Sequence, residues 1–228
     1  MEQVLLSWSA GKDSALALYE ILKDPAYRVQ ALLTTVTEDY DRVSMHGIRR
    51  SLLERQARAL GLPLEVVRIP AHGSNDGYEA RMAKALARHQ ARGVTAVAFG
   101  DTSLEEVRAY RERNLARAGL RGVFPLWGRD ARALVRSFIR LGFRAITTCV
   151  DTQALDARLA GRPVDERFLA ELPANVDPCG ENGEYHSFVC DGPIFSVPVA
   201  YTVGGTVLRE GRFAYCDLLP AWGTGCAA

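Results

Sequence analysis

Apolar and polar positions follow two different patterns at the start of the chain. Residues 4–8 form an apolar run that leaves no room for a helix before Gly11, which predicts a buried strand. Residues 15–22 then carry apolar side chains at the spacing of a helix face, and this pattern ends at Pro25. The beginning of the chain therefore predicts a strand, a loop and a helix.

The same alternation continues to residue 150. Further strands are predicted over residues 29–35, 64–69, 96–100, 123–126 and 145–150, and further helices over residues 48–60, 78–92 and 131–141. Another helix is expected to open at Ser103, which has capping-box spacing to Glu106, and to stop at Gly119. Alternating elements of these lengths predict an α/β fold, a doubly wound parallel sheet with helices on both faces.

The pattern changes character after residue 150. Residues 151–183 are rich in Pro, Asp and Gly, and residues 185–190 and 199–208 have the composition of strands. We therefore expect two domains, a parallel α/β domain over residues 1–122 and a smaller mixed α/β domain over residues 123–228.

Composition narrows the classes of partner. The chain has 228 residues, 48% of them apolar and 24% charged, as in an ordinary globular protein. Its net charge of +1 does not favour a nucleic-acid backbone or an anionic membrane as the main partner. The longest uncharged run, residues 192–208, is broken by prolines and glycines, and no signal peptide is visible, so we expect a cytoplasmic protein with a small or modest-sized substrate.

The loop between the first strand and the first helix is suited to bind phosphate. It reads Ser9, Ala10, Gly11, Lys12, Asp13 and Ser14. Free amides and the positive end of the helix dipole attract an anion there, Gly11 permits close approach, and Lys12 adds a full positive charge. These six residues are the predicted ATP-binding loop. A helix N-terminus that is merely capped by Ser and Asp is the alternative interpretation.

This loop resembles the S-G-G-K-D-S motif of the PP-loop ATP pyrophosphatases, with Ala10 in place of the first glycine. Enzymes of that class cleave ATP between the α and β phosphates and adenylate a substrate. The loop is not a Walker A motif, because Lys12 is followed by Asp13 rather than by a hydroxyl residue.

Four further motifs resemble the diphthine-ammonia ligase family. They are Met45-His46-Gly47-Ile48-Arg49, Gly100-Asp101, Pro125-Leu126-Trp127-Gly128-Arg129, and the segment from Asp177-Pro178-Cys179-Gly180-Glu181-Asn182-Gly183-Glu184 to Tyr185-His186-Ser187-Phe188. The resemblance implies a PP-loop nucleotide-binding domain followed by a smaller domain with an acidic Gly-Glu motif, and it implies ATP with Mg²⁺ as cofactors. Ammonia and a carboxylate on a small molecule or a modified residue are the implied substrates.

The acidic motif departs from that of relatives that act on diphthine. They usually carry Gly and Glu where this chain has Asn182 and His186. The Asn/His pattern resembles a bacterial branch for which a role in cobalamin salvage has been suggested. The acyl substrate is therefore left open.

Three residues of the first domain are further candidates. Asp101 closes the fourth predicted strand, which the family resemblance places beside the first, so it is the predicted catalytic residue and Mg²⁺ ligand; helix capping is the alternative. His46 is expected to contact ATP and Arg49 the substrate, because both lie at a helix start after the second strand. Ordinary surface residues are the alternative there.

The acidic motif supplies the predicted substrate site. Its candidates are Gly180, Glu181, Asn182, Gly183, Glu184 and His186. The glycines permit tight turns, the glutamates attract ammonium or take its proton, and Asn182 and His186 can hydrogen-bond a polar substrate. Glu184 joins Lys12 and Asp101 as a predicted catalytic residue, whereas a solvated acidic turn is the alternative interpretation. Cys179 is expected to be a small buried thiol rather than a nucleophile.

The leading hypothesis is an AMP-forming, ATP-dependent amide ligase whose first domain holds ATP and whose second holds the acyl substrate and ammonia. One alternative is a PP-loop tRNA-modifying enzyme, suggested by the arginines of residues 108–121, although these are more simply a solvated helix face and no C-x-x-C pair is present. A non-catalytic adenine-nucleotide-binding module is the other. A homodimer is compatible with the sequence.

Overall fold

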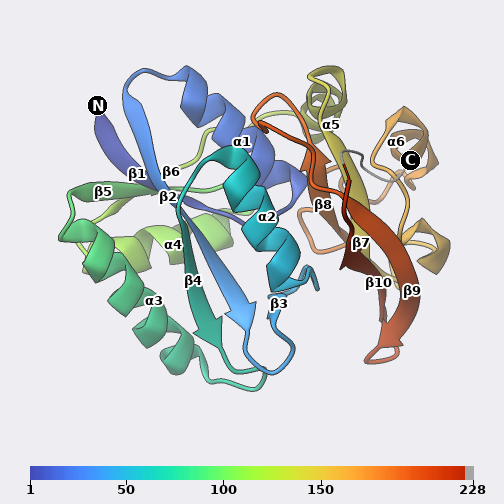
Figure 1. The fold of residues 1–228 in the computed structure, drawn as a ribbon, viewed down its shortest axis with the longest axis horizontal. Coiled ribbons are helices and arrows are strands. Elements are labelled where there is room, and N and C mark those ends of the chain that lie inside the picture. The colour runs from blue at the N-terminus through green and yellow to red at the C-terminus, as the bar shows by residue number, and fades with distance from the viewer. Residues whose placement is uncertain (224–228) are drawn as a thin grey trace.

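The computed structural model describes residues 1–223, so the last five residues of the second predicted domain lie outside the described part of the chain. Within the described part, two sheets lie side by side (Figure 1). The strands of the first sheet fall within residues 2–123, and those of the second within residues 144–220. The exact division at residue 122 stays a prediction.

The first sheet is built around β1 (Glu2–Ser7). β2 (Tyr27–Thr37) and β5 (Val94–Ala98) pair with it in parallel, one on each side. β4 (Leu64–Ile69) lies beyond β2, β6 (Arg121–Val123) lies beyond β5, and the short β3 (Arg42–Val43) runs antiparallel to the end of β2. The predicted parallel sheet is thus confirmed, and the strand order reverses between β1 and β5, where ligands of such sheets bind.

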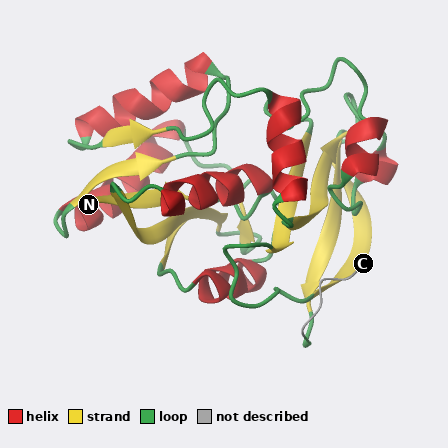
Figure 2. Cartoon of the chain, turned by 90° about the horizontal axis from the view of Figure 1, so that it is seen from above, coloured by secondary structure: helices red, strands yellow, loops and turns green. Residues whose placement is uncertain are grey.

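Helices cover both faces of this sheet, as predicted (Figure 2). Along β1, Val4 and Leu6 pack into one hydrophobic cluster with α1 (Lys12–Lys23) and α2 (Arg50–Leu60). Leu5 packs into a second cluster with α3 (Asn75–Gln90) and α4 (Glu105–Arg117). Because successive strand side chains point to opposite faces, one apolar run fills both layers.

The second sheet is antiparallel, in the order β8-β7-β10-β9. The part of the chain that forms this sheet contains, in order, α5 (Ala131–Arg140), β7 (Arg144–Asp151), the 3-10 turn η1 (Ala157–Leu159), α6 (Glu166–Glu171), β8 (Tyr185–Asp191), β9 (Tyr201–Arg209) and β10 (Phe213–Pro220). The sequence pattern did not predict β3, η1, α6 or β10. The predicted mixed α/β character of this region is nevertheless present.

Two local predictions were wrong. The strand expected over residues 123–126 is β6, which ends at Val123, because Pro125 cannot donate to a ladder. Ser103 does not cap α4: the helix is preceded by Leu104 with no side-chain cap. The Ser103 amide instead lies 3.4 Å from a carboxylate oxygen of Glu181, far along the chain.

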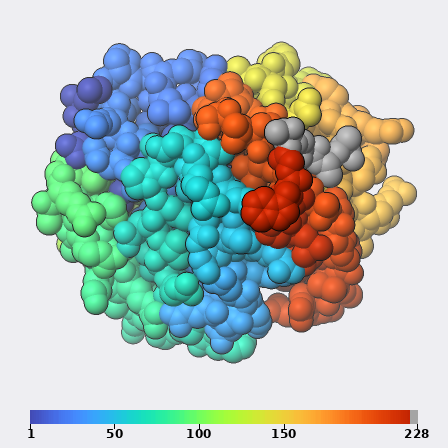
Figure 3. Space-filling model, viewed as in Figure 1, coloured from blue at the N-terminus to red at the C-terminus, as the bar shows by residue number. Residues whose placement is uncertain are grey.

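The two sheets share one hydrophobic core rather than meeting at a polar seam. The cluster that contains Val4 and Leu6 extends to Phe188 and Val189 of β8. The end of β10 also packs on α2, and the surfaces of the two parts join closely in Figure 3. The contact therefore fixes the orientation of the second sheet relative to the first.

Gln56 is a buried polar link within this shared core. Its side-chain carbonyl accepts from the indole N–H of Trp8 at 3.0 Å. Its amide nitrogen donates to the carbonyl oxygens of Ala10 at 3.1 Å and Val189 at 2.6 Å. One side chain of α2 thus links the loop that follows β1 to β8.

We expect Gln56→Leu to lower the free energy of unfolding by about 2 kcal/mol, because it leaves the buried Trp8 N–H without its acceptor. Chemical denaturation measures this value. Gln153→Leu, at an exposed glutamine, is the matched control and should change it by no more than about 0.5 kcal/mol. An equal, small effect of both substitutions would contradict the assigned role of Gln56.

Candidate active site

A cavity of about 200 Å³ lies at the carboxyl ends of β1 and β5, and both parts of the chain line it. Its predicted site residues are Ser9, Lys12, Asp13, Ser14, His46, Asp101, Gly180, Glu181 and His186. Phe99, Arg111, Tyr185 and Ser187 are further lining residues. The other predicted site residues are not among those that line it: Ala10, Gly11, Arg49, Asn182, Gly183 and Glu184.

The phosphate loop is held in one conformation by bonds within it and from β8. Ala10 has a left-handed backbone with φ +67°, which explains why glycine suits this position of the motif. Its carbonyl accepts from the Val189 amide at 2.9 Å, and the hydroxyl of Ser14 donates to the Gly11 carbonyl at 2.9 Å. The start of α1 is therefore aimed at the cavity by the second sheet as well as the first.

Gly100 allows the segment after β5 to approach this loop. A Cβ atom at Gly100 would lie 2.7 Å from the carbonyl carbon of Asp13 and 2.8 Å from its oxygen. Those atoms belong to the backbone of α1, which cannot turn aside as a flexible side chain can. A glycine is thus required where Asp101 is brought next to the phosphate loop.

Lys12 joins the phosphate loop to the acidic motif. Its buried ammonium donates to both Asp13 oxygens, at 2.8 and 3.0 Å, and to the carbonyl of Cys179, and it lies 4.8 Å from the centre of the Tyr185 ring. Burial lowers the pKa of Lys12, but the Asp13 carboxylate, Tyr185 and Cys179 together outweigh burial, so the pKa of Lys12 is raised. The Lys12 amide also donates to the Ser187 hydroxyl at 3.1 Å. The phosphate loop and the acidic motif are therefore in contact, and the expected division of ATP and acyl substrate between the two domains stays a prediction.

The two glutamates of the acidic motif differ in position. Glu181 lines the cavity and accepts from the Thr102 amide at 2.9 Å. Burial raises the pKa of Glu181, and the carboxylates of Asp13 and Asp101 raise it further. Three carboxylates thus surround one cavity.

Glu184 is buried in its own loop instead. Its carboxylate accepts from the amides of Asp177 and Asn182, at 3.1 and 3.0 Å, and from the Asn182 side chain at 3.0 Å. These bonds shape the turn that presents Glu181. The structure does not bring Glu184, Asn182 or Gly183 to the cavity wall, although the sequence predicted them there.

His46 and His186 form a ring pair at the boundary of the two sheets. Their ring centres are 4.4 Å apart with the planes inclined by 36°. Burial lowers the pKa of His186 to about 4, and Lys12 contributes to the shift. Burial and the neighbouring His186 likewise hold the pKa of His46 well below its usual value. Both rings are therefore neutral near pH 7 and can accept a hydrogen bond or a proton.

A neighbouring cavity of about 310 Å³ opens beside this ring pair. It is lined by Ser7 at the end of β1 and by Trp8 and Ser9 after it, by Leu33, Thr34 and Thr35 of β2, and by residues 43–46. Tyr78, Met82, Leu86, Val97, Phe99, Arg111, Leu115 and His186 complete the wall. The two cavities share Ser9, both histidines, Phe99 and Arg111, so a single elongated ligand can occupy both.

Arg111 is a site residue that the sequence analysis missed. Its Nε and Nη2 atoms donate to the two Asp101 oxygens at 2.5 and 3.0 Å, and its guanidinium lies 4.4 Å from the centre of the Phe99 ring. Spacing could have revealed it, because Arg111 lies four residues before the buried Leu115 and four after Val107, on the apolar side of α4. It does not belong to a purely solvated arginine face.

The carboxylates around the cavity are suited to bind a metal ion that is also coordinated by phosphate. Within the described residues, no group of three or more His, Cys, Asp or Glu side chains is arranged to hold a metal by itself. Asp101 is paired with Arg111, and Asp13 with Lys12. Mg²⁺ commonly takes one or two carboxylates together with phosphates and water. Asp13, Asp101 and Glu181 around the same cavity are compatible with that mode.

The side chains of Trp127 and Cys179, both within the motifs that carry the family resemblance, supply no reacting group. Trp127 packs against Phe124, with the Arg108 guanidinium 4.7 Å from its ring centre. The Cys179 thiol is buried, which raises its pKa to about 12 and makes it a poor nucleophile at neutral pH.

The strand order, the Lys12 loop and the shared cavities define an α/β nucleotide-binding protein of the PP-loop ATP pyrophosphatase class. Residues 1–122 match the diphthamide synthase N-terminal domain and residues 130–204 match the diphthamide synthase C-terminal domain. The chain therefore belongs to the diphthamide synthase family.

Known proteins of this family are distant in sequence. The chain is 27% identical over 225 residues to a diphthine–ammonia ligase of Danio rerio, covering 89% of this chain and 87% of that protein. A diphthine–ammonia ligase of Schizosaccharomyces pombe is 26% identical over 215 residues, which are 85% of this chain but 35% of that longer protein. A solved structure, a predicted subunit of tRNA methyltransferase from Methanocaldococcus jannaschii, is similar with TM-score 0.44 and 18% identity, over 84% of this chain and 98% of that one.

In the described residues, no helix combines the length and the apolar character that a membrane crossing requires.

Arg49, the predicted substrate-binding residue, is instead part of the contact between the sheets. Its Nε and Nη2 atoms donate to Asp217 of β10 at 3.1 and 2.6 Å, and Arg42 donates to the same carboxylate at 2.8 Å. These arginines lower the pKa of Asp217 to about 2. The ion pair therefore stabilises the fold above the ordinary Asp pKa near 4 and loses this effect as the pH falls through 2.

We expect Arg49→Met to lower the free energy of unfolding by about 1 kcal/mol near pH 7, a value reduced by the partial exposure of the pair. The difference from the unsubstituted protein should shrink as the pH falls toward 2. Denaturant titrations at several pH values measure it, while calorimetry with a non-hydrolysable ATP analogue should show unchanged affinity. Weakened nucleotide binding with an unchanged free energy of unfolding would show that Arg49 acts in the active site.

Proposed function

We propose that this chain is an ATP-dependent, AMP-forming amide ligase that adenylates a substrate carboxylate and couples it to ammonia. The observation that carries the proposal is Lys12, whose ammonium contacts both the phosphate loop and the acidic motif across 167 residues of chain. A site that only stored a nucleotide would not need a buried, permanently charged group between two motifs. A departing pyrophosphate does need one.

In this proposal the triphosphate lies at the start of α1 and the nucleoside in the neighbouring cavity. The loop amides, Lys12 and the hydroxyls of Ser9 and Ser14 hold the β and γ phosphates. A carboxylate oxygen attacks the α phosphorus, a new P–O bond forms, and the bond to the β phosphate breaks as pyrophosphate leaves with the electron pair. Positioning and charge stabilisation by these residues supply most of the catalysis.

Ammonia then attacks the acyl carbon, a C–N bond forms, AMP leaves with the electrons of the broken C–O bond, and the nitrogen loses a proton. Glu181 is our candidate for holding ammonium, because its carboxylate lines the cavity. It takes the role that the sequence gave to Glu184, which instead shapes the turn. The neutral pair His46 and His186 lies beside the same space and can accept hydrogen bonds from ammonia.

Asp101 and Asp13 are the residues that would hold Mg²⁺ together with ATP. The ion would neutralise charge on the leaving pyrophosphate. The relatives named diphthine–ammonia ligase make a modified-residue carboxylate one candidate substrate, and a small carboxylic acid is the other. We further propose a cytoplasmic reaction that uses free ammonia and no nucleic acid, with the oligomeric state open to a homodimer. No observation on the described residues favours the tRNA-modifying or the non-catalytic alternative.

We expect Lys12→Met to reduce kcat at least a hundredfold, which corresponds to about 3 kcal/mol in the barrier, because the charge facing the leaving group is lost. The measurement is AMP and pyrophosphate formed from ATP with ammonium and a panel of carboxylic acids. Lys23→Met, at the exposed lysine of the same helix, is the matched control and should retain full activity. Wild-type kcat in Lys12→Met, with folding verified by thermal denaturation, would refute the assignment of the phosphate loop.

Asp101→Asn should raise the Mg²⁺ concentration for half-maximal AMP formation several-fold, because an amide is a weaker ligand for a hard cation. Arg111→Gln keeps the carboxylate and removes the cation that competes for it, so it should not raise the Mg²⁺ concentration for half-maximal AMP formation. Equal Mg²⁺ dependence in Asp101→Asn and the unsubstituted enzyme would make Asp101 a partner of Arg111 only.

A further inference from the structure

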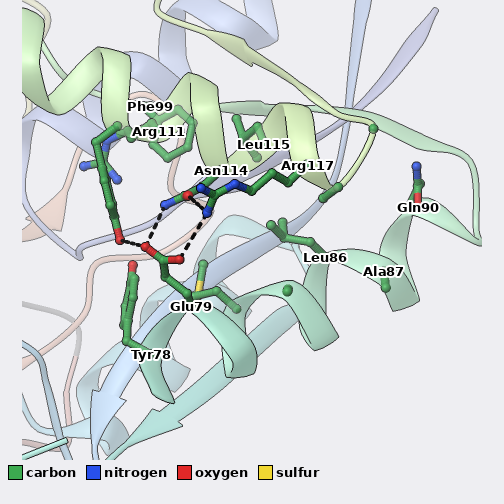
Figure 4. Close-up of a pocket in the computed structure, with 15 residues that line it drawn as sticks. Tyr78, Glu79, Leu86, Ala87, Gln90, Phe99, Arg111, Asn114, Leu115 and Arg117 are labelled. Carbon is green, nitrogen blue, oxygen red and sulfur yellow. Dashed lines mark hydrogen bonds and ion pairs between the residues drawn. The ribbon is translucent and has the colours of Figure 1, made fainter. Parts of the chain in front are cut away.

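A groove of about 560 Å³ runs between α3 and α4, outside the cavities that the proposed function uses (Figure 4). Its inner wall is apolar and includes Met82, Leu86, Phe99 and Leu115. Pockets of a few hundred Å³ with apolar walls and few polar groups are typical of small-molecule sites. The groove therefore has the size and lining to hold an organic molecule.

The groove opens into the candidate active site at one end. Phe99 and Arg111 line the groove, the neighbouring cavity and the phosphate cavity alike. Tyr78, Met82 and Leu86 are shared between the groove and the neighbouring cavity. The groove and the two cavities therefore meet at Phe99 and Arg111.

Arg111 places a positive charge at that end. Asp101 occupies its Nε and Nη2 atoms, while its Nη1 atom makes no hydrogen bond to any of residues 1–223. The Phe99 ring below holds the guanidinium plane, and the side chain is 30% exposed. A guanidinium fixed in this way is suited to bind an incoming carboxylate.

The rim carries one further ion pair, between Glu79 and Arg117, and the Arg117 side chain is 72% exposed. Glu79 faces the groove from α3, but its carboxylate accepts from Tyr110 at 3.0 Å, from Asn114 at 3.5 Å and from Arg117 at 3.4 Å (Figure 4). These donors come from α4 and close the polar side of the groove. The part of a ligand that lies beyond Arg111 therefore meets mainly apolar side chains.

We propose that the groove binds the apolar body of the acyl substrate, a small amphipathic carboxylic acid, and that Arg111 holds its carboxylate toward the phosphate loop. The identification of this ligand as the acyl substrate rests on the proposed ligase function. The binding of an amphipathic carboxylate does not. Arg111 is a binding and orienting residue in this proposal.

Binding of 6-phenylhexanoate, phenylacetate and 6-phenylhexanamide, followed by calorimetry or NMR titration in the absence of ATP, tests the proposal. We expect 6-phenylhexanoate to bind at least tenfold more tightly than the shorter acid, because it fills more of the groove, and tenfold more tightly than the amide. Arg111→Gln should lower the affinity for the acid to that for the amide while leaving the affinity for the amide unchanged. A merely structural arginine would weaken both probes equally.

Ala87→Trp fills the groove, and Ala80→Trp on the same helix, outside the lining, is the matched control. Ala87→Trp should lower the affinity for 6-phenylhexanoate at least tenfold, and Ala80→Trp should leave it unchanged. The affinity for a non-hydrolysable ATP analogue should be unchanged in both variants. Equal binding of the acid by both variants, or of acid and amide by the unsubstituted protein, would overturn the proposal. These titrations contain no ATP, so a failure to form AMP would count against the ligase function alone.

Discussion

The enclosed ammonium of Lys12 is the interaction on which the site depends. A buried charge is tolerated only where partners compensate for the lost water, and here Asp13, the Cys179 carbonyl and the Tyr185 ring provide them. Two of these partners come from the second half of the chain. The charge of Lys12 in the phosphate loop is therefore fully compensated only when that half has packed against the first. This coupling explains why the two sheets share a core and why Gln56 links them through the loop backbone.

The balance of positive and negative charge in the cavity also depends on the buried Lys12. The carboxylates of Asp13, Asp101 and Glu181 face a space whose compensating cations are Lys12 and Arg111, and the histidine pair adds no charge near pH 7. Negative groups that crowd a partly buried space raise one another's pKa, as they do for Glu181. A polyphosphate would add to that repulsion unless a cation accompanied it. The site therefore favours ATP that carries Mg²⁺ over the free nucleotide.

The sequence predicted most of what local patterns determine. The parallel sheet, its helices and the phosphate loop follow from periodicity within short windows. By contrast, α6 is a short helix of six residues, and β10 pairs on one side with β7, which is distant along the chain. The same limit applies to side chains. Whether Glu181 or Glu184 reaches the cavity depends on how one turn folds. Arg49 pairs with Asp217 and Arg111 with Asp101, and neither pairing can be deduced from the spacing of these residues along the chain.

The backbone at the loop shows how closely the two halves constrain each other. Ala10 adopts a left-handed conformation that costs an alanine roughly 1 kcal/mol, yet its methyl group is fully buried in the shared core. Gly100 cannot gain even a methyl group without meeting the Asp13 backbone. The loop therefore has no freedom to adjust its own shape around a ligand. Adaptation to different acyl groups must instead come from side chains at the edge of the site. The α3–α4 groove has exposed alanines, and substitutions there would disturb the phosphate loop least.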